Sequence, residues 1–256
     1  MANNGEPLKL VVWSYQIHRD NLWVIPWEVE SMTRKQKAVV IGSILGDGYL
    51  QKTGKNNARL RFEHSIKQKE YLLWKYQILS NYFQSKPQYL ERKNAKFGKT
   101  YQYIRAQSYS GSEFGKLLKL FYQNSKKVVP ENIPNLLKDP LSLAVWFMDD
   151  GYYYPRDKMA YIYLPKYDPD SVKNLLFALK ENFGLSPSLK IKKRGEYVLI
   201  FSVYETKKLM EMIKLLVIPT MYYKLSSQQI LSDPVSTESS SKGDIRFSLD
   251  EMQAAK

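Results

Sequence analysis

The sequence predicts an α+β fold made of two copies of one small unit, each with the order helix, two strands, helix, two strands, helix. Three observations support this prediction. Similar segments recur about 100 residues apart, several short segments alternate apolar with polar residues, and 44% of the 256 residues are hydrophobic, which is enough for a substantial core. Such a period is far too long for a solenoid, so the recurrence indicates two fused units.

The repeat is clearest at two places. Residues 79–87 and 179–187 each begin with Leu, carry Phe at the fifth position and end with Pro. The triplet Asp-Gly-Tyr occurs at 47–49 and again at 150–152. The small difference in spacing between these two matches fits insertions in the loops that join shared elements.

Each copy is expected to begin with a short apolar helix that ends at an Asp-Gly pair. In the first copy, helices and strands are predicted at 35–47, 49–53, 58–64, 67–83, 88–94, 100–108 and 111–122. In the second copy they are predicted at 141–150, 152–155, 158–164, 169–183, 188–194, 196–203 and 205–216. Three prolines, Pro130, Pro134 and Pro140, fall between the copies, where a linker belongs.

The chain is therefore divided into five parts. An N-terminal extension at 1–34 precedes the first unit at 35–122, a linker at 123–140 leads to the second unit at 141–231, and a tail occupies 232–256. The tail has only one short apolar group, so it cannot bury enough surface to offset the entropy of ordering, and we expect it to be mobile.

The charge balance indicates a polyanionic partner. The chain has 39 Lys and Arg against 25 Asp and Glu, a formal net charge of +14, which favours nucleic acid first and an anionic membrane surface second. No apolar run reaches the roughly 18 residues of a membrane-spanning helix, and 1–6 lack the features of a secretory signal, so we expect neither a membrane protein nor a secreted one. The absence of Cys excludes disulfides and Cys nucleophiles, and two histidines, His18 and His64, are too few for a multi-His metal site.

Several predicted strands present one polar face. In 59–63, 101–107 and 188–194, basic, tyrosine and amide side chains share a face, while Leu189 and Ile191 point the other way. An ordinary solvated face is the alternative for one strand. Several such strands in so basic a chain indicate a nucleic-acid surface, because base recognition needs such side chains on a rigid support. The candidate DNA-binding residues are Arg59, Arg61, Tyr103, Arg105, Gln107, Lys190, Lys192 and Arg194.

Small residues mark the two helices that end at Asp-Gly. Gly42 and Gly46 are four residues apart, so they share one helix face and let another backbone approach closely, and Ala144 is the small residue of the second helix. Gly48 and Gly151 are typical of the left-handed position that ends a helix.

The carboxylate at each of these helix ends is unfavourable unless a cation lies nearby. Asp47 and Asp150 lie at the negative end of a helix dipole, where an anion is disfavoured by about 0.3–1 kcal/mol. If the two helices pack side by side, the carboxylates meet at one end of the contact. With no Cys in the chain and no His nearby in the sequence, such a pair favours a hard, oxygen-liganded cation such as Mg²⁺. A plain turn would explain one Asp-Gly pair but not two within a duplication.

The segments 41–48, Ile-Gly-Ser-Ile-Leu-Gly-Asp-Gly, and 143–151, Leu-Ala-Val-Trp-Phe-Met-Asp-Asp-Gly, resemble the two motifs of LAGLIDADG homing endonucleases, in the single-chain branch encoded in organellar introns. The resemblance covers about residues 35–231. It implies two pseudo-symmetric αββαββα units that form a saddle over DNA, and metal binding by the last acidic residue of each motif, here Asp47 and Asp150. Gly46 and Asp149 belong to the same implied metal site, although Asp149 occupies a variable motif position.

The resemblance extends to 124–130 and 218–225, where the family carries a lysine near each scissile phosphate, here Lys127 and Lys224. It implies a monomer that cuts both strands of double-stranded DNA across the minor groove with Mg²⁺ and leaves short 3′ overhangs. Mn²⁺ is expected to substitute, and Ca²⁺ to support binding without efficient cleavage. In this mechanism metals held by the aspartates activate water and neutralise the phosphate, and the lysines stabilise developing negative charge.

Two other functions stay open at this point. Some members of the family are RNA maturases that bind their own intron RNA, often after losing the acidic residues, and a nuclease-dead DNA-binding protein is the third hypothesis. Both motif aspartates are present, which favours the enzyme, although one protein can do both. The resemblance places the protein in a mitochondrion, a chloroplast or a bacterial cytoplasm.

Overall fold

The chain folds into two similar halves in the computed structural model, which describes residues 32–94, 96, 98–192 and 195–225. The first half contains α1 (Arg34–Leu45), β1 (Tyr49–Lys52), β2 (Ala58–Ser65), α2 (Lys69–Ile78), β3 (Gln88–Lys93), β4 (Thr100–Gln107) and α3 (Ser112–Phe121). The second half contains α5 (Pro140–Asp150), β7 (Gly151–Tyr154), β8 (Met159–Leu164), α6 (Pro169–Phe183), β9 (Ser188–Ile191), β10 (Tyr197–Phe201) and α7 (Val203–Ile213). The predicted tail and nearly all of the N-terminal extension lie outside the described residues.

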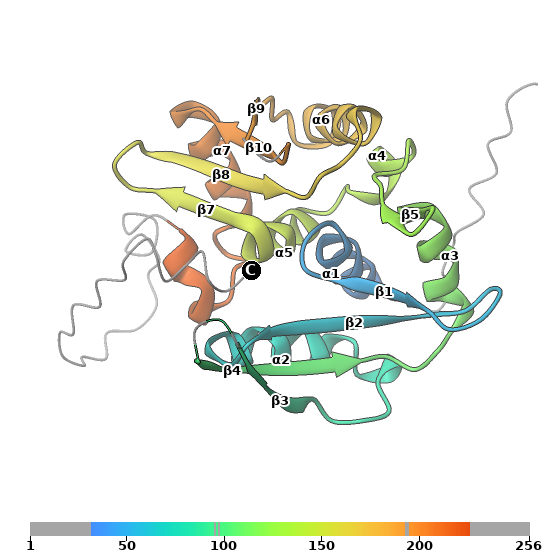
Figure 1. Cartoon of the computed structure of the whole chain (residues 1–256). Helices are drawn as coiled ribbons and strands as arrows, with labels where there is room; N and C mark the ends of the chain where they lie inside the picture. Colours follow the sequence, from blue (N-terminus) through green and yellow to red (C-terminus); the bar gives the residue numbers. More distant parts are fainter. Residues whose placement is uncertain (1–31, 95, 97, 193–194, 226–256) are drawn as a thin grey trace, which may run out of the picture.

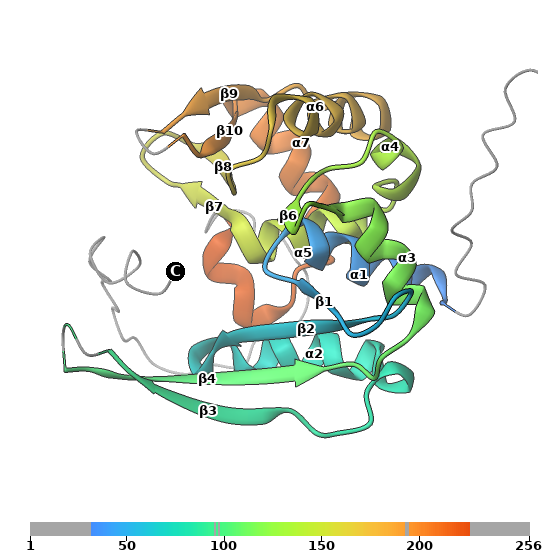
Figure 2. The same ribbon diagram turned by 45° about the vertical axis from the view of Figure 1, so that its right-hand side comes forward.

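Two four-stranded antiparallel sheets have the same strand order, β1-β2-β4-β3 and β7-β8-β10-β9. The predicted α+β class and the repeated order of elements are therefore confirmed. Figures 1 and 2 show the sheets on opposite sides of a central pair of helices, α1 and α5. No helix within the described ranges is both long enough and apolar enough to cross a membrane.

Local sequence explains where the central helices begin. At α1 the Thr33 hydroxyl accepts a hydrogen bond from the Gln36 amide N–H, and the Gln36 side chain accepts one from the Thr33 N–H, which is a capping box. At α5 the Asp139 carboxylate accepts from the Leu141 N–H, and Pro140 occupies the first helical position, where its missing N–H costs nothing.

The helices α1 and α5 run in the same direction, side by side. At their first turns, Arg34 Nε donates to the Asp139 carboxylate at 2.7 Å. At their last turns, the Asp47 N–H donates to Asp149 Oδ2 at 3.2 Å. Because both ends are joined in this way, the two Asp-Gly pairs lie at the same end of the helix pair.

Two glycines permit the close contact between these helices. A Cβ added to Gly42 would lie 2.4 Å from the Ser142 carbonyl oxygen and 2.8 Å from Val145 Cβ. One added to Gly46 would lie 2.5 Å from Asp149 Cβ. The predicted close approach at both glycines is present, but the nearest residues of α5 at Gly42 are Ser142 and Val145 rather than the expected Ala144.

The prediction that Gly48 and Gly151 adopt left-handed backbone angles is wrong. Gly151 is extended, with φ −83° and ψ 156°, and the described glycines with positive φ are at other positions. These two glycines are needed for space instead. A Cβ on Gly48 would lie 2.5 Å from the Ser43 carbonyl oxygen, and one on Gly151 would lie 2.3 Å from the Phe147 ring.

Each sheet has one face on the core and one open face. Along β2 buried and half-buried residues alternate, so that Leu60, Phe62 and His64 face inward. Helices α2 and α3 pack against the first sheet and α7 against the second. The prediction for β9 is only partly confirmed, because Leu189 and Ile191 remain 39% and 63% exposed. This strand lies at the sheet edge, where few residues cover it.

The predicted linker contains structure of its own. The short strands β5 (Tyr122–Gln123) and β6 (Lys126–Lys127) form a hairpin, and α4 (Ile133–Leu136) packs against α6. The hairpin has consequences for the site described below.

The contact between α1 and α5 predicts a large effect of one added methyl group. Gly42→Ala should destabilise the protein by about 1–3 kcal/mol, because overpacking a rigid backbone contact outweighs the helix propensity gained by Ala. Urea denaturation measures this loss of stability. Gly54→Ala is the matched control, since its Cβ would meet nothing closer than 3.8 Å. Equal stability of both variants would show that the helices are not in tight contact at Gly42.

Candidate active site

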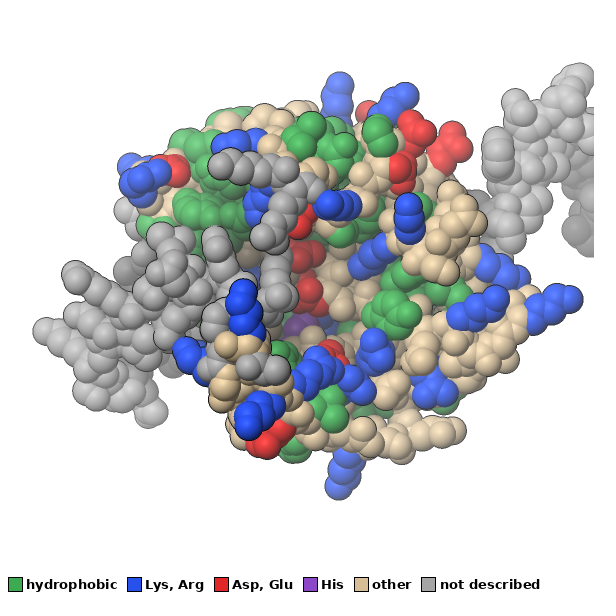
Figure 3. Space-filling view, viewed as in Figure 1, with side chains coloured by type: hydrophobic (Ala, Val, Ile, Leu, Met, Phe, Trp, Pro, Cys, Tyr) green, Lys and Arg blue, Asp and Glu red, His purple; other side chains and the backbone are tan. Residues whose placement is uncertain are grey.

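The two motif aspartates lie together at the ends of the central helices. Asp47 follows the last turn of α1 and its side chain is 46% exposed. Asp150 is the last residue of α5 and is partly exposed. In Figure 3 acidic side chains are visible at the centre of the face between the two sheets, with basic side chains around them. Both motif carboxylates are therefore at least partly exposed to solvent.

Each aspartate is accompanied by a lysine in an equivalent position. Lys127 Nζ donates to the Gly46 carbonyl oxygen at 2.7 Å, and Lys224 Nζ donates to the Asp149 carbonyl oxygen at 2.8 Å. Gly46 and Asp149 are the residues that precede the two motif aspartates. The sequence repeat loses its register around these lysines, but the structure places both on the same carbonyl of each motif. Both ammonium groups also lie where the helix dipole favours a cation.

Different local structures hold the two lysines. Lys127 belongs to the hairpin of β5 and β6, whose two turn residues, Asn124 and Ser125, have φ values of 49° and 63°. Two consecutive positive φ values are typical of a type I′ hairpin turn. Lys224 is the last residue of a 3-10 helix, η3 (Pro219–Lys224), and is buried.

Lys127 is electrostatically coupled to the aspartates of both motifs. Burial lowers the pKa of Lys127 from its ordinary value, while Asp150, Asp47 and Asp149 oppose that shift without overcoming it. Because both motif aspartates act on one ammonium group, they share its neighbourhood.

Asp149 is buried and forms an ion pair with the first half. Lys75, on α2, is fully buried, and its Nζ lies 2.8 Å from Asp149 Oδ1 and 3.1 Å from Oδ2. Burial alone would raise the pKa of Asp149, but the Lys75 ammonium holds the pKa of Asp149 below its usual value. The ammonium also lies 4.2 Å from the centre of the Tyr71 ring, where it gains a cation–π interaction.

His64 completes this buried cluster. Its Nε2 lies 3.3 Å from Lys75 Nζ, and its Nδ1 lies 3.9 Å from Asp47 Oδ2. Burial, and then the Lys75 ammonium, lower the pKa of His64 to about 3, so the ring is neutral at physiological pH. One ligand atom each from Asp47, His64 and Asp149 lie within 4.8 Å of one another. The Lys75 ammonium already occupies the Asp149 carboxylate, which disfavours a second cation among these three groups.

The candidate DNA-binding residues of the first half share the open face of its sheet. The strand pairing places them on the side opposite the buried Leu60, Phe62 and Ile104. These residues are Arg59, Arg61, Tyr103, Arg105 and Gln107.

The acidic residue of this polar face, Glu63, forms ion pairs with two arginines of the sheet. Glu63 binds Arg105 Nη2 at 2.6 Å and Arg92 Nη1 at 2.5 Å. These contacts fix both guanidinium groups in one orientation on the sheet.

The open face of the second sheet is rich in tyrosine instead. Lys190 and Lys192 lie on it, and Lys192 Nζ is 4.2 Å from the centre of the Tyr163 ring. The tyrosine rings contact one another edge to face, and they belong to Tyr152, Tyr154 and Tyr161. Arg194, the last predicted residue, lies outside the described residues.

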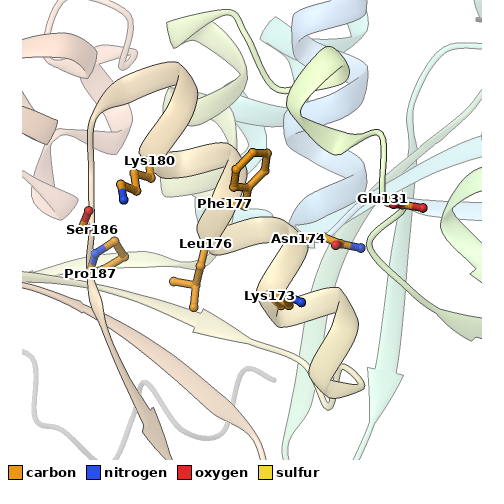
Figure 4. A pocket seen from close by; sticks show the side chains of 8 residues that line it. All are labelled: Glu131, Lys173, Asn174, Leu176, Phe177, Lys180, Ser186 and Pro187. Atoms are coloured by element: carbon orange, nitrogen blue, oxygen red, sulfur yellow. The ribbon is translucent and has the colours of Figure 1, made fainter. Parts of the chain in front are cut away.

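A surface pocket of about 700 Å³ lies away from this site, along α6 (Figure 4). Phe177, Lys173 and Lys180 line it, together with Glu131. None of its lining residues comes from the motifs, so it is not part of the candidate site.

Sequence analysis found Asp47, Asp150 and both lysines but missed His64 and Lys75. A signal for both was present. His64 has the same parity as the apolar Leu60 and Phe62 along its strand, and Lys75 lies between Tyr71 and Leu79 at helical spacing. A polar residue at a core-facing position needs a buried partner.

Comparison with known proteins agrees with this geometry. Residues 37–209 match the LAGLIDADG DNA endonuclease family. A probable intron-encoded endonuclease 1 of Wickerhamomyces canadensis is 29% identical over 201 residues, covering 76% of this chain and 85% of the relative. A cytochrome b mRNA maturase bI2 of Debaryomyces hansenii is 26% identical over 200 residues, covering 77% of this chain and 75% of the relative.

A solved structure has the same fold. The homing endonuclease I-WcaI, bound to its DNA recognition sequence, aligns with a TM-score of 0.69 and 26% identity, over 82% of this chain and 95% of that one. The fold and the paired motif carboxylates are those of a nuclease of the homing endonuclease type. The chain belongs to the LAGLIDADG DNA endonuclease family.

The buried imidazole predicts a pH dependence of stability. Between pH 6.5 and about 3 the unfolded chain binds a proton on His64 that the folded chain does not. Stability should therefore fall as the pH decreases through this window, by at most about 1.4 kcal/mol per pH unit from this group. His64→Leu should reduce that slope between pH 6.5 and 4.5, measured by urea denaturation with EDTA present. The same slope in both proteins would contradict the burial of a neutral His64.

Proposed function

We propose that this protein is a site-specific homing endonuclease that makes a divalent-metal-dependent double-strand break in DNA. One observation carries the proposal. Asp47 and Asp150 lie at the same end of two parallel helices and face solvent, and each is preceded by a carbonyl that a lysine binds. Such a pair of carboxylates with flanking cations is suited to phosphodiester hydrolysis, which requires an activated water and a neutralised phosphoryl group.

The donor set fits a hard divalent cation. Asp47 and Asp150 offer carboxylate oxygens, and the Gly46 carbonyl oxygen retains a second lone pair beside its bond to Lys127. We propose Mg²⁺ as the physiological ion, with Mn²⁺ as a substitute and Ca²⁺ supporting binding only, because Ca²⁺ adopts a larger and looser coordination shell. Asp149 contributes through its buried ion pair rather than as a ligand.

The residues of this chain have separate roles in the proposed reaction. A metal held by Asp47 and Asp150 would supply Lewis-acid activation of water and of the phosphate. Lys127 and Lys224 are placed to stabilise negative charge that develops on the phosphate oxygens. We propose that Lys127, whose pKa is lowered by burial, also donates a proton to the leaving oxygen.

The open faces of the two sheets are the proposed DNA-binding surface. The first carries Arg59, Arg61 and Arg105, and the second carries Lys190 and Lys192. Guanidinium and amide groups on a rigid strand can form paired hydrogen bonds to purines in the major groove. We propose double-stranded DNA as the partner of a monomer that does not associate with membranes.

A second function is supported by relatives that are named maturases. The cytochrome b mRNA maturase bI2 of Debaryomyces hansenii aligns over 77% of this chain, so binding of the protein's own intron RNA is an additional proposal. The names of the Wickerhamomyces canadensis and Debaryomyces hansenii relatives favour an intron-encoded protein. Among the compartments expected from the sequence, we therefore propose an organelle.

The decisive test is cleavage of a plasmid that carries the intronless allele of the host gene, with and without Mg²⁺. Linear product that requires Mg²⁺ supports the proposal. Binding of the intron RNA without any cleavage of this DNA would instead favour the maturase. Stable DNA binding without cleavage would favour a nuclease-dead DNA-binding protein.

Removing either motif carboxylate should stop cleavage but not binding. Asp47→Asn and Asp150→Asn should each reduce double-strand cleavage roughly 100-fold or more, since loss of even an outer partner of a metal site costs about 10–100-fold. DNA binding in Ca²⁺ should survive in a gel-shift assay, because the amide relieves carboxylate repulsion without changing shape. Full linearisation by Asp150→Asn would show that the wrong carboxylate was assigned.

Asp149→Asn is the contrasting variant. It leaves the buried Lys75 ammonium without its counter-charge, which typically costs about 3–5 kcal/mol of stability. The variant should therefore melt earlier than Asp150→Asn, and its cleavage per folded molecule should be reduced less. A stability equal to that of the unmodified protein would argue against the buried ion pair.

DNA affinity should depend steeply on salt, because phosphate contacts release counterions. If Lys190 contacts a phosphate, Lys190→Ala should weaken binding and reduce the slope of log K against log salt by about one. Lys173→Ala, on α6 beside the surface pocket, is the control and should leave the slope unchanged. A salt-independent affinity of the unmodified protein would contradict a phosphate-tracking surface.

A further inference from the structure

Two buried polar residues of the first half, His64 and Lys75, meet Asp149 of the second half, and the positions equivalent to all three are apolar or lack a side chain. The register of the paired strands gives the first correspondence. Tyr49 pairs with Arg61 and Tyr152 pairs with Tyr161, so three residues further along each strand His64 corresponds to Leu164.

Two more correspondences complete the comparison. Four residues before the matched Leu79 and Leu179, Lys75 corresponds to Leu175, and both are fully buried. At the motifs, Asp149 corresponds to Gly46. The polar set His64, Lys75 and Asp149 therefore corresponds to Leu164, Leu175 and Gly46, each of which lies in the half opposite to its counterpart.

Packing alone does not account for the polar set. Leu164 and Leu175 fill the corresponding places in the same molecule at 4% and 0% exposure. Removing an ammonium and a carboxylate from water is costly, and apolar replacements of similar volume are often at least as stable. A feature that leucines could replace structurally is expected to serve something other than stability.

The cluster also contacts one of the two motif aspartates. Asp149 Oδ2 accepts a hydrogen bond from the Asp47 N–H at 3.2 Å, and His64 Nδ1 lies 3.9 Å from Asp47 Oδ2. At the positions equivalent to Asp149 and His64, Gly46 has no side chain and Leu164 is apolar, so neither can offer a carboxylate or an imidazole to Asp150. Asp47 is thus held at its backbone and approached at its carboxylate by groups whose counterparts are Gly46 and Leu164.

We propose that His64, Lys75 and Asp149 are positioning residues that fix Asp47 and make the two halves of the active site unequal, so that the two DNA strands are cut at different rates. The inference rests on the proposed nuclease function. Lys75 fixes the Asp149 carboxylate, that carboxylate fixes the Asp47 backbone, and the His64 ring limits where the Asp47 carboxylate can lie.

The test measures each strand separately. A duplex of the true target carries a different dye on each strand, and single-turnover cleavage in Mg²⁺ gives one rate constant for each. The unmodified protein should cut the strands at rates that differ several-fold and should accumulate nicked plasmid. His64→Leu, which installs the residue of the second half, should change the ratio of the two rate constants by at least about tenfold while binding in Ca²⁺ stays the same.

Two further variants separate positioning from folding. His64→Asn places an amide near the position of Nδ1 and should restore the ratio toward that of the unmodified protein. Leu164→Ala, at the matched site of the second half, should lower the melting temperature without changing the ratio. If His64→Leu does not fold, the double variant Lys75→Leu with Asp149→Asn, which leaves no buried charge unpaired, should change the ratio in its place.

The outcomes are distinct. Equal strand rates in the unmodified protein, or a ratio that His64→Leu and the double variant leave unchanged, overturn the inference while the nuclease function stands. A protein that cuts neither strand of its true target overturns the proposed function itself.

Discussion

The close parallel contact of α1 and α5 is the constraint on which the rest of the structure depends. It exists because Gly42 and Gly46 have no side chains to hold the helices apart. It places Asp47 and Asp150 at one end of the helix pair and directs the side chain of Asp149 into the opposite half. A separation larger by one methyl group would move both motif carboxylates relative to each other, and with them any cation or phosphate that they bind.

This arrangement concentrates negative charge at the least favourable end of two helices. The last-turn carbonyl groups already carry partial negative charge, and the motif carboxylates add to it. Lys127 and Lys224 offset this charge by binding the carbonyls of Gly46 and Asp149. The negative charge that remains is consistent with the divalent cation proposed above. Stability and function therefore oppose each other here, as is common where active sites hold like charges close together.

The two halves have the same backbone arrangement, but their side chains differ. The open face of the first sheet presents arginines, two of them oriented by Glu63, whereas that of the second presents tyrosine rings and lysine. The interiors also differ, because the buried His64 and Lys75 of the first half have Leu164 and Leu175 as their counterparts in the second. Two halves that differ in this way are suited to a DNA target whose two halves also differ, because each side meets different chemical groups.

The sequence by itself determined the repeated order of elements, the two helix-end aspartates and the polar faces of the strands, because these follow from periodicity and local motifs. It also contained the polar residues His64 and Lys75 at core-facing positions. Their partner could not be identified from the sequence, since Lys75 and Asp149 are 74 residues apart. The equivalence of Lys127 and Lys224 was likewise decided by tertiary structure, because a hairpin and a 3-10 helix place them on matching carbonyls. The local sequence pattern specifies which face of a helix or strand a side chain occupies. Only the packing of the two halves determines which side chains of one half contact those of the other.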